Sequence, residues 1–186
     1  MRSDRGARTT RRSPRARVTG SRVAKSSEVT SSTATATKEK QLKFYLQRDA
    51  PVEDAPSIGP RTAEHLSRVQ IVTVRDLLDA DVETAAAELN HRRIKPQTLR
   101  EWQEQAALVC RIPELRGHDA QILVAIEVTT PESLVQFRPA DLFAKVAPFV
   151  NTPEGERIVR NGKKPDLEEV TFWIECAKQS RTLHAA

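Results

Sequence analysis

The amino-acid sequence predicts an all-α protein that follows a disordered N-terminal tail. From Gln41 onward, apolar residues recur at three- and four-residue spacing, as in Ala63, Leu66 and Val69, which is the period of one helix face. The chain has only six glycines and no alternating strand pattern of useful length, which argues against a β-rich fold with many tight turns. We therefore expect roughly eight to ten short helices.

Charge divides the 186-residue chain into two predicted parts. Residues 1–40 hold 11 basic and 3 acidic side chains, a net charge of +8, whereas residues 41–186 hold 19 basic and 22 acidic side chains, a net charge of −3. The first part is also rich in serine and threonine and has no aromatic residue, so it cannot bury enough apolar surface to offset its ordering entropy. We predict that residues 1–40 are a disordered basic tail and that residues 41–186 are a helical domain.

The composition of the basic tail is consistent with three roles. Guanidinium groups bind phosphate through two parallel hydrogen bonds, so the tail is suited to act as an electrostatic arm for nucleic acid. It could equally be a solubilising linker, and its composition also resembles a mitochondrial transit peptide, although no amphipathic apolar face supports that role. The tail residues that we expect to contact nucleic acid are Arg11, Arg12, Arg15 and Arg17.

The location of the protein is predicted from what the sequence lacks. No apolar run reaches the roughly 18 residues that a transmembrane helix needs, and the N-terminus has no apolar core of a signal peptide, so we expect no membrane association. Two cysteines are too few for a disulfide scaffold and fit a reducing compartment. We predict a cytoplasmic protein, with association with the nucleoid as the more specific alternative.

Helix start signals recur along the predicted domain. Thr73 and Asp81 each precede a run with helical periodicity, and a side-chain oxygen at that position can accept the first free backbone N–H groups. Thr130 and Thr152 are each followed by proline, which is preferred at the first helical position. We therefore expect helices to begin directly after these four residues.

An internal repeat organises the helices. Alignment of the chain with itself places Ala55–Ala63 on Ile112–Ala120. A second alignment, in which the chain is shifted by more residues along the sequence, places Trp102 on Trp173. We call these two shifts the offsets of the repeat. The difference between the two offsets requires an insertion in the second copy, which we expect near residues 151–165. The sequence thus predicts two copies of one unit, at about residues 50–110 and 111–184, with both tryptophans in the core.

The repeated segment has the form of a phosphate-binding hairpin. Pro56–Ala63 resembles the helix-hairpin-helix motif, in which a tight turn directs backbone N–H groups of the second helix toward a phosphate. Such a hairpin reads the backbone and not the bases. In this hairpin Arg61 would add positive charge and Ile58 would fill the gap between the helices. The residues that we expect to contact nucleic acid here are Ser57, Ile58, Gly59, Arg61 and Thr62.

The ordered set of hairpin, Thr73–Leu78, Trp102–Ala106 and Ile112-Pro113 resembles a bacterial family, the domain of unknown function DUF4332. The resemblance covers about residues 50–180. It implies tandem helix-hairpin-helix repeats, packed as a SAM-like helical bundle about a pseudo-twofold axis, and it implies nucleic-acid binding by superfamily. The family has no assigned activity.

The two hairpins differ in the residues that a phosphate would meet. Ser57 replaces the first hairpin glycine of copy one and is expected to restrict the turn. Copy two has Glu114 and Arg116 at both glycine positions, and Glu114 is expected to place a carboxylate where a phosphate would lie. We therefore assign phosphate binding to the first hairpin and a structural role to the second.

A further basic group follows in the predicted insertion. Lys163 and Lys164 lie near Arg157 and Arg160 in the sequence and form either a second phosphate contact or a solvated loop. If nucleic acid binds the domain, we expect one positive face that joins Arg61, Arg92 and Arg93 with this pair of lysines.

No pattern in the sequence predicts catalysis. The chain has no P-loop, glycine-rich dinucleotide turn or nucleophile elbow, and its four histidines have no partner at metal-ligand spacing. Cys110 and Cys176 lie in apolar helical contexts, which favours buried structural thiols.

We expect a protein that is not an enzyme, has no cofactor or metal, and binds DNA or RNA non-specifically. The alternative is a protein–protein interaction or scaffolding module with an unknown partner and an incidental tail. The oligomeric state is left open.

Overall fold

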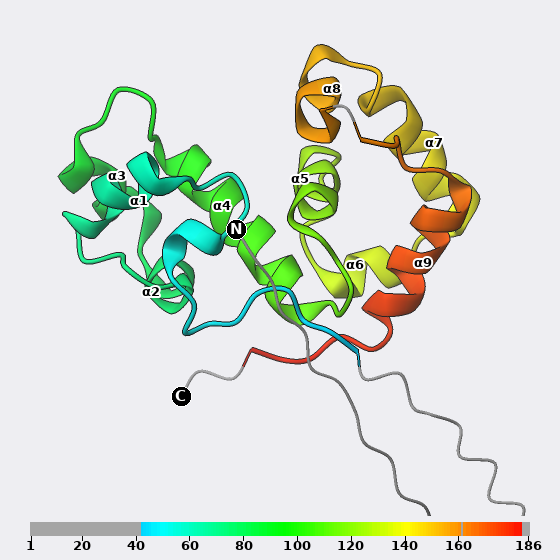
Figure 1. Cartoon of the computed structure of the whole chain (residues 1–186), viewed down its shortest axis with the longest axis horizontal. Coiled ribbons are helices and arrows are strands. Elements are labelled where there is room, and N and C mark those ends of the chain that lie inside the picture. The colour runs from blue at the N-terminus through cyan, green and yellow to red at the C-terminus, as the bar shows by residue number, and fades with distance from the viewer. Residues whose placement is uncertain (1–41, 161, 184–186) are drawn as a thin grey trace, which may run out of the picture. The chain divides into compact units, whose positions relative to one another are not determined.

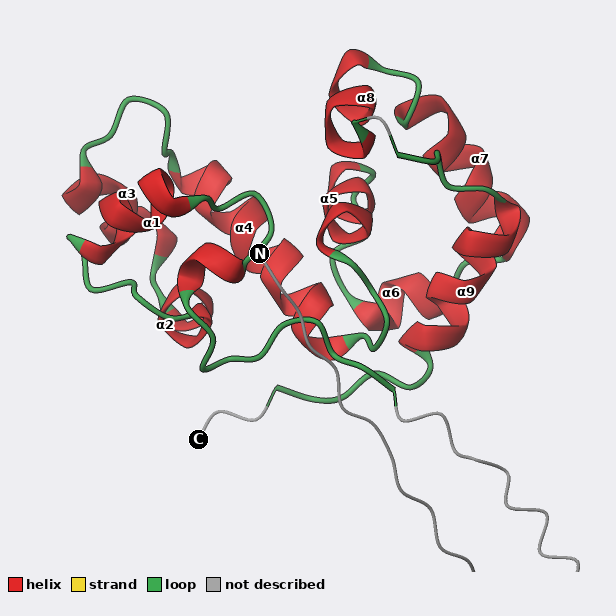
Figure 2. Ribbon diagram, viewed as in Figure 1, coloured by secondary structure: helices red, strands yellow, loops and turns green. Residues whose placement is uncertain are grey.

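The structure, a computed structural model, describes residues 42–160 and 162–183. These residues form nine α-helices and one short 3-10 helix, with no strand beyond a single bridge between Pro51 and Thr73, which confirms the predicted all-α fold (Figure 2). The predicted tail, with its arginines, lies outside the described residues. The elements are η1 (Val52–Asp54), α1 (Pro60–Ser67), α2 (Val74–Asp79), α3 (Val82–Leu89), α4 (Pro96–Arg111), α5 (Gly117–Ala125), α6 (Pro131–Val135), α7 (Pro139–Phe149), α8 (Pro153–Val159) and α9 (Leu167–Ala177).

All four predicted helix starts are confirmed. The hydroxyl of Thr73 accepts from Asp76 N at 3.2 Å, and the Asp76 carboxylate accepts from Thr73 N at 2.8 Å, which completes a capping box. The side chains of Asp81, Thr130 and Thr152 each accept a backbone N–H from the third residue of the following helix. Because each cap satisfies one N–H that the helix itself cannot satisfy, short helices such as α2 and α6 have defined beginnings.

The helix starts follow both offsets of the sequence repeat. Along the sequence, the start of α5 follows the start of α1 by the same number of residues as Ile112 follows Ala55. The starts of α6 and α7 follow those of α2 and α3 by this same number. The start of α9 follows that of α4 by the larger offset that separates Trp173 from Trp102. The helix α8 lies between α7 and α9, within the stretch 151–165, whereas only a loop joins α3 to α4. The helix-hairpin-helix description of these units stays a prediction.

Backbone conformation repeats at the same spacing. Ser57 and Glu114 have φ angles of 65° and 59°, and Gln70 and Glu127 have φ angles of 63° and 65°. The left-handed region costs about 1–2 kcal/mol for a residue with a side chain, so its occurrence at equivalent positions shows that both copies follow the same path. Ser57 adopts the positive φ angle that glycine would provide there, so the turn keeps its path at the energetic cost of a side chain in this region.

The helices pack in two groups that meet at α4 and α5. In the first group α2 and α3 pack against α4, and in the second α6 and α7 pack against α9 while α5 contacts α7 and α8 (Figure 1). The direct contact between α4 and α5 joins the groups. One hydrophobic cluster extends through all of these contacts.

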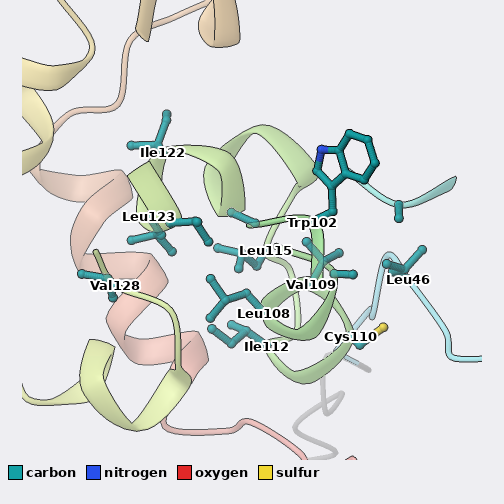
Figure 3. Close-up of a cluster of buried hydrophobic side chains, with 14 of the residues drawn as sticks. Leu46, Trp102, Leu108, Val109, Cys110, Ile112, Leu115, Ile122, Leu123 and Val128 are labelled. Atoms are coloured by element: carbon teal, nitrogen blue, oxygen red, sulfur yellow. The ribbon is translucent and has the colours of Figure 1, made fainter. Parts of the chain in front are cut away.

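The core contains the residues that the repeat predicts. Trp173 is 1% exposed and Trp102 is 9% exposed, and both cysteines are buried, so the predicted core roles of these four residues are confirmed. Figure 3 shows the part of the cluster where side chains of α4 and α5 gather around the turn between them. Burial raises the pKa of the Cys110 thiol to about 11, which makes it a poor nucleophile.

Segments from both ends of the described chain close over the end of α4. Arg181 donates from Nε to Cys110 O at 2.7 Å and from Nη2 to Leu46 O at 3.3 Å, and its guanidinium lies 4.0 Å from the centre of the Phe44 ring. The backbone of Glu114 also donates to Lys43 O at 2.7 Å. The segment from residue 43 is therefore fastened to the turn between the two groups.

Replacing Gly155 with alanine will destabilise the second group of helices. A Cβ at Gly155 would lie 2.5 Å from Val150 Cα and still closer to Phe149 O, and both of these are backbone atoms that cannot rotate away. We expect the free energy of unfolding to fall by about 1–3 kcal/mol, the usual range for overpacking. Urea unfolding followed by circular dichroism measures the change.

The matched control for this substitution is Gly59→Ala. A Cβ at Gly59 would meet no atom within 4 Å, and the φ angle of −107° suits alanine. We expect Gly59→Ala to lower the urea midpoint less than Gly155→Ala does, because only the preference for glycine over alanine at an N-cap is lost. Equal midpoints for the two variants would contradict the close packing of α8 on the end of α7.

Candidate nucleic-acid interface

The first hairpin presents a helix start that no side chain caps. Gly59 is the N-cap of α1, Pro60 occupies the first helical position, and no side chain of the described residues accepts a hydrogen bond from the first turn. Ile58 is 5% exposed, as expected for the residue that fills the gap between the helices. The hydroxyl of Ser57 donates to Oε1 of the buried Gln105 at 2.7 Å, so its described role is to fasten the turn to α4.

Beside this helix start lies a pocket of about 350 Å³ with a basic lining. One wall comes from α1, and the other comes from the loop between α3 and α4. The floor is apolar, because it is formed by the side chains of Ile94 and Trp102, which are buried at 5% and 9% exposure. The residues that line this basic pocket are Arg61, Thr62, His65, His91, Arg92, Arg93, Ile94 and Trp102.

Local structure brings the loop back over α1. Asn90, with a φ angle of 43°, ends α3 in the left-handed conformation, which turns the chain directly after the helix. Arg93 N donates to Nδ1 of His91 at 3.3 Å, and the buried Ile94 anchors the end of the loop. The ring of His91 therefore lies against that of His65, with the ring centres 4.7 Å apart.

The arginines of this basic pocket have no carboxylate partner among the described residues. Arg61, Arg92 and Arg93 are exposed and form no ion pair within 4.0 Å in the part of the chain that the structure describes. By contrast, ion pairs to carboxylates are formed by Arg48, Arg68, Arg75, Arg100, Arg111, Arg116 and Arg157. The pocket is thus a positive site within a domain whose net charge is −3.

A larger hollow of about 930 Å³ has the opposite character. Parts of α4, α5 and α8 line it, and its carboxylates outnumber its arginines, which are Arg157 and Arg160. The carboxylates belong to Glu101, Glu104, Glu127 and Glu154. Because these groups would repel phosphate, the smaller pocket is the better candidate for an anion.

The lysines of the predicted second contact lie elsewhere. Lys163 Nζ is 2.6 Å from Asp166 Oδ2, and this hydrogen bond raises the pKa of Lys163. Lys164 Nζ donates to Asn151 Oδ1 at 2.7 Å and lies 3.6 Å from Glu156 Oε1. Neither lysine lines the basic pocket, so the structure gathers Arg61, Arg92 and Arg93 without them.

The second hairpin uses its own carboxylate to cap its helix. Asp119, which is 2% exposed, accepts from Arg116 N at 3.1 Å and occupies the position equivalent to Thr62. Burial raises the pKa of Asp119, although the neighbouring His118 opposes this effect. Asp119 was not predicted from the sequence, although an acidic residue three positions after the cap is the signal that identifies such a capping group.

The expectation that Glu114 places its carboxylate at the phosphate position of the second hairpin is therefore wrong. Its carboxylate accepts from Lys43 N at 3.1 Å and from the Tyr45 hydroxyl at 3.4 Å, so it binds the segment from residue 43. At the helix start of copy two, the carboxyl group of Asp119 accepts from the backbone N–H of the N-cap residue Arg116. The contact between the rings of His65 on α1 and His91 in the loop after α3 was also not predicted, because these residues lie far apart in the sequence.

The part of the chain that the structure describes offers neither a metal site nor a membrane-spanning helix. No group of three or more histidine, cysteine, aspartate or glutamate side chains is placed to hold a metal ion within residues 42–160 and 162–183. Over the same ranges, no helix has both the length and the apolar character needed to cross a membrane.

Comparison with known proteins identifies a family. No curated protein and no solved structure matches this chain. The model of the family described as "Domain of unknown function (DUF4332)" matches residues 56–180, from the first hairpin to just beyond the end of α9. Since this match covers more than half of the sequence, the chain belongs to the DUF4332 family.

Proposed function

We propose that this chain binds nucleic acid through phosphate groups, without reading the bases. The first hairpin and the basic pocket beside it would dock a phosphate, and the tail of residues 1–40 would supply long-range attraction. The observation that carries the proposal is the convergence of Arg61, Arg92 and Arg93 on one pocket without a carboxylate among the described lining residues. Guanidinium groups without an ion-pair partner are free to form bidentate hydrogen bonds to phosphate oxygens.

The position of the pocket supports the same conclusion. The uncapped start of α1 lies beside Arg61 and Thr62, so the partial positive charge of the helix adds to that of the arginines. The equivalent helix start in copy two already holds Asp119. One domain therefore offers one hairpin to an anion, and the protein would act as a binding module and not as an enzyme.

Replacing Arg61 with glutamate will weaken binding to duplex DNA. We expect about a tenfold loss of affinity at moderate salt and a salt slope that falls by about 0.9, which corresponds to one lost phosphate contact. Duplexes of different sequence should lose affinity to the same extent, since phosphates carry no base identity. Fluorescence anisotropy of a labelled duplex, titrated at several salt concentrations, measures both quantities.

Arg138→Glu is the matched control for this substitution. Arg138 is also exposed, also lies at a helix start and also has no ion pair among the described residues, but it does not line the basic pocket. Both variants change the net charge equally, so a purely diffuse attraction would weaken equally in the two. Equal losses would overturn the proposed docking site, and a normal melting temperature for both variants would show that folding is intact.

The alternative function is a protein-interaction or scaffolding module. The net charge of −3 on residues 41–186 favours it, because an acidic domain repels nucleic acid overall. The same titration separates the two functions: a parent chain that binds no duplex or single strand, DNA or RNA, at low salt would leave the interaction module as the better assignment.

A further inference from the structure

We propose, resting on the function above, that the basic pocket binds the terminal phosphate of a nucleic-acid strand and not an internal phosphodiester. The ligand class is a phosphomonoester that carries a nucleoside on one side only. The observations that lead to this are the shape of the pocket, its excess of positive charge and its apolar floor.

The shape favours an end over a continuous backbone. An internal phosphodiester is attached to a nucleotide on both sides, so the strand must run along an open surface. The basic residues here instead converge on one depression of about 350 Å³, between α1 on one side and the loop from His91 to Ile94 on the other. Cations that converge on one point suit a single terminal phosphate better than a row of internal phosphates.

The charge exceeds what one phosphodiester needs. An internal phosphodiester carries one negative charge, whereas a phosphomonoester carries about 1.5 to 2 near neutral pH and offers three acceptor oxygens. Three guanidinium groups line the pocket, and none forms an ion pair within the described residues. A dianion would satisfy this set of donors better than a monoanion would.

The remaining lining suits the nucleoside that follows the phosphate. The imidazole rings of His65 and His91 lie together with their planes 41° apart, and the floor is formed by Ile94 and Trp102. Flat rings and apolar side chains accept a sugar or base of any sequence, because every base has a π face. The site therefore provides for both parts of a terminal nucleotide.

The second copy lacks this chemistry and serves as an internal comparison. At the positions that match Arg61, Thr62 and His65, it has His118, Asp119 and Ile122. Asp119 and Ile122 are 2% and 0% exposed, so they belong to the interior. The same backbone can thus be built without a basic pocket, and the pocket in copy one is not required by the fold.

Duplexes with different ends test the proposal in the full-length protein. Blunt DNA duplexes of one sequence are prepared with 5′-phosphate, with 3′-phosphate or with hydroxyl ends only, and a covalently closed circle of similar composition has no ends. We expect about tenfold tighter binding to a duplex with one kind of terminal phosphate than to the hydroxyl duplex, because hydrogen bonds between charged groups are about twice as strong as neutral ones. A nucleoside monophosphate should compete for the terminal component alone.

Variants connect the preference to the pocket. The double substitution Arg92→Ala with Arg93→Ala should abolish the preference for phosphorylated ends, whereas Arg138→Ala should retain it. Equal affinity of the parent for phosphorylated, hydroxyl and closed DNA would overturn the inference, even if all three depend on Arg61. In that case the proposed phosphate-backbone function would survive, whereas a parent that binds none of them would overturn both.

Discussion

Replacing Trp173 with alanine will lower the free energy of unfolding by about 3–5 kcal/mol, which is the usual cost of removing a large aromatic side chain from a core. Trp173 is 1% exposed on α9, the helix that packs against both α6 and α7. The substitution leaves a cavity that these helices cannot fill without moving. Because small domains are stable by only about 5–15 kcal/mol, a large part of the native stability would be lost.

Urea unfolding followed by circular dichroism measures this loss, and the adjacent Phe172→Ala provides a matched control. Phe172 is on the same helix but is 45% exposed, so its truncation should shift the midpoint much less. Trp102→Ala should also cost about 3–5 kcal/mol, toward the lower end because Trp102 is 9% exposed. If Trp173→Ala and Phe172→Ala unfold at the same urea concentration, the assigned core is wrong.

Deleting residues 1–40 will remove most of the affinity for nucleic acid. The deletion changes the formal net charge from +5 to −3, because it removes 11 basic and 3 acidic side chains. We expect binding at low salt to fall on the order of 100-fold, and we expect the salt slope to fall by about 0.9 for each phosphate that the tail neutralises on duplex DNA. Anisotropy titrations of the full chain and of residues 41–186, each at several salt concentrations, measure both effects.

A substitution within the tail separates charge from length. Replacing Arg11, Arg12, Arg15 and Arg17 with glutamine keeps all 186 residues and lowers the net charge by four. We expect an intermediate affinity and an intermediate slope. An unchanged slope after the full deletion would disprove the electrostatic arm. If instead the deletion abolishes binding and Arg61→Glu has no effect, the domain is a passive carrier of the tail and the interaction-module alternative gains support.

The local features of the fold were predictable because their causes lie within a few residues. A cap such as Thr73 acts on an N–H only three residues away, and a proline at the first helical position needs no distant partner. The repeat places Trp102 and Trp173 at equivalent positions of the two copies, and this match predicted that both tryptophans lie in the core. These signals were sufficient to predict the class of fold, the helix starts and the buried anchors.

The candidate site was predictable only in part. The hairpin placed Arg61 and Thr62 at a helix start, and the basic run around Arg92 was visible within an otherwise acidic domain. The composition of the chain could not show which other basic side chains lie in the same pocket as Arg61 and Arg92. Lys163 and Lys164 looked equally suitable in the sequence, but the structure pairs them with neighbouring oxygen atoms instead.

The sequence by itself thus determined the helices, their order and the doubling of the unit, since hydrogen bonds within a turn and the 3.6-residue period are local properties. Only the tertiary structure decided that His65 meets His91, that Glu114 binds the segment from residue 43, and that three arginines share one pocket. These contacts join residues that lie far apart along the chain. They depend on how whole helices pack, and packing is the sum of many weak contacts that no short stretch of sequence contains.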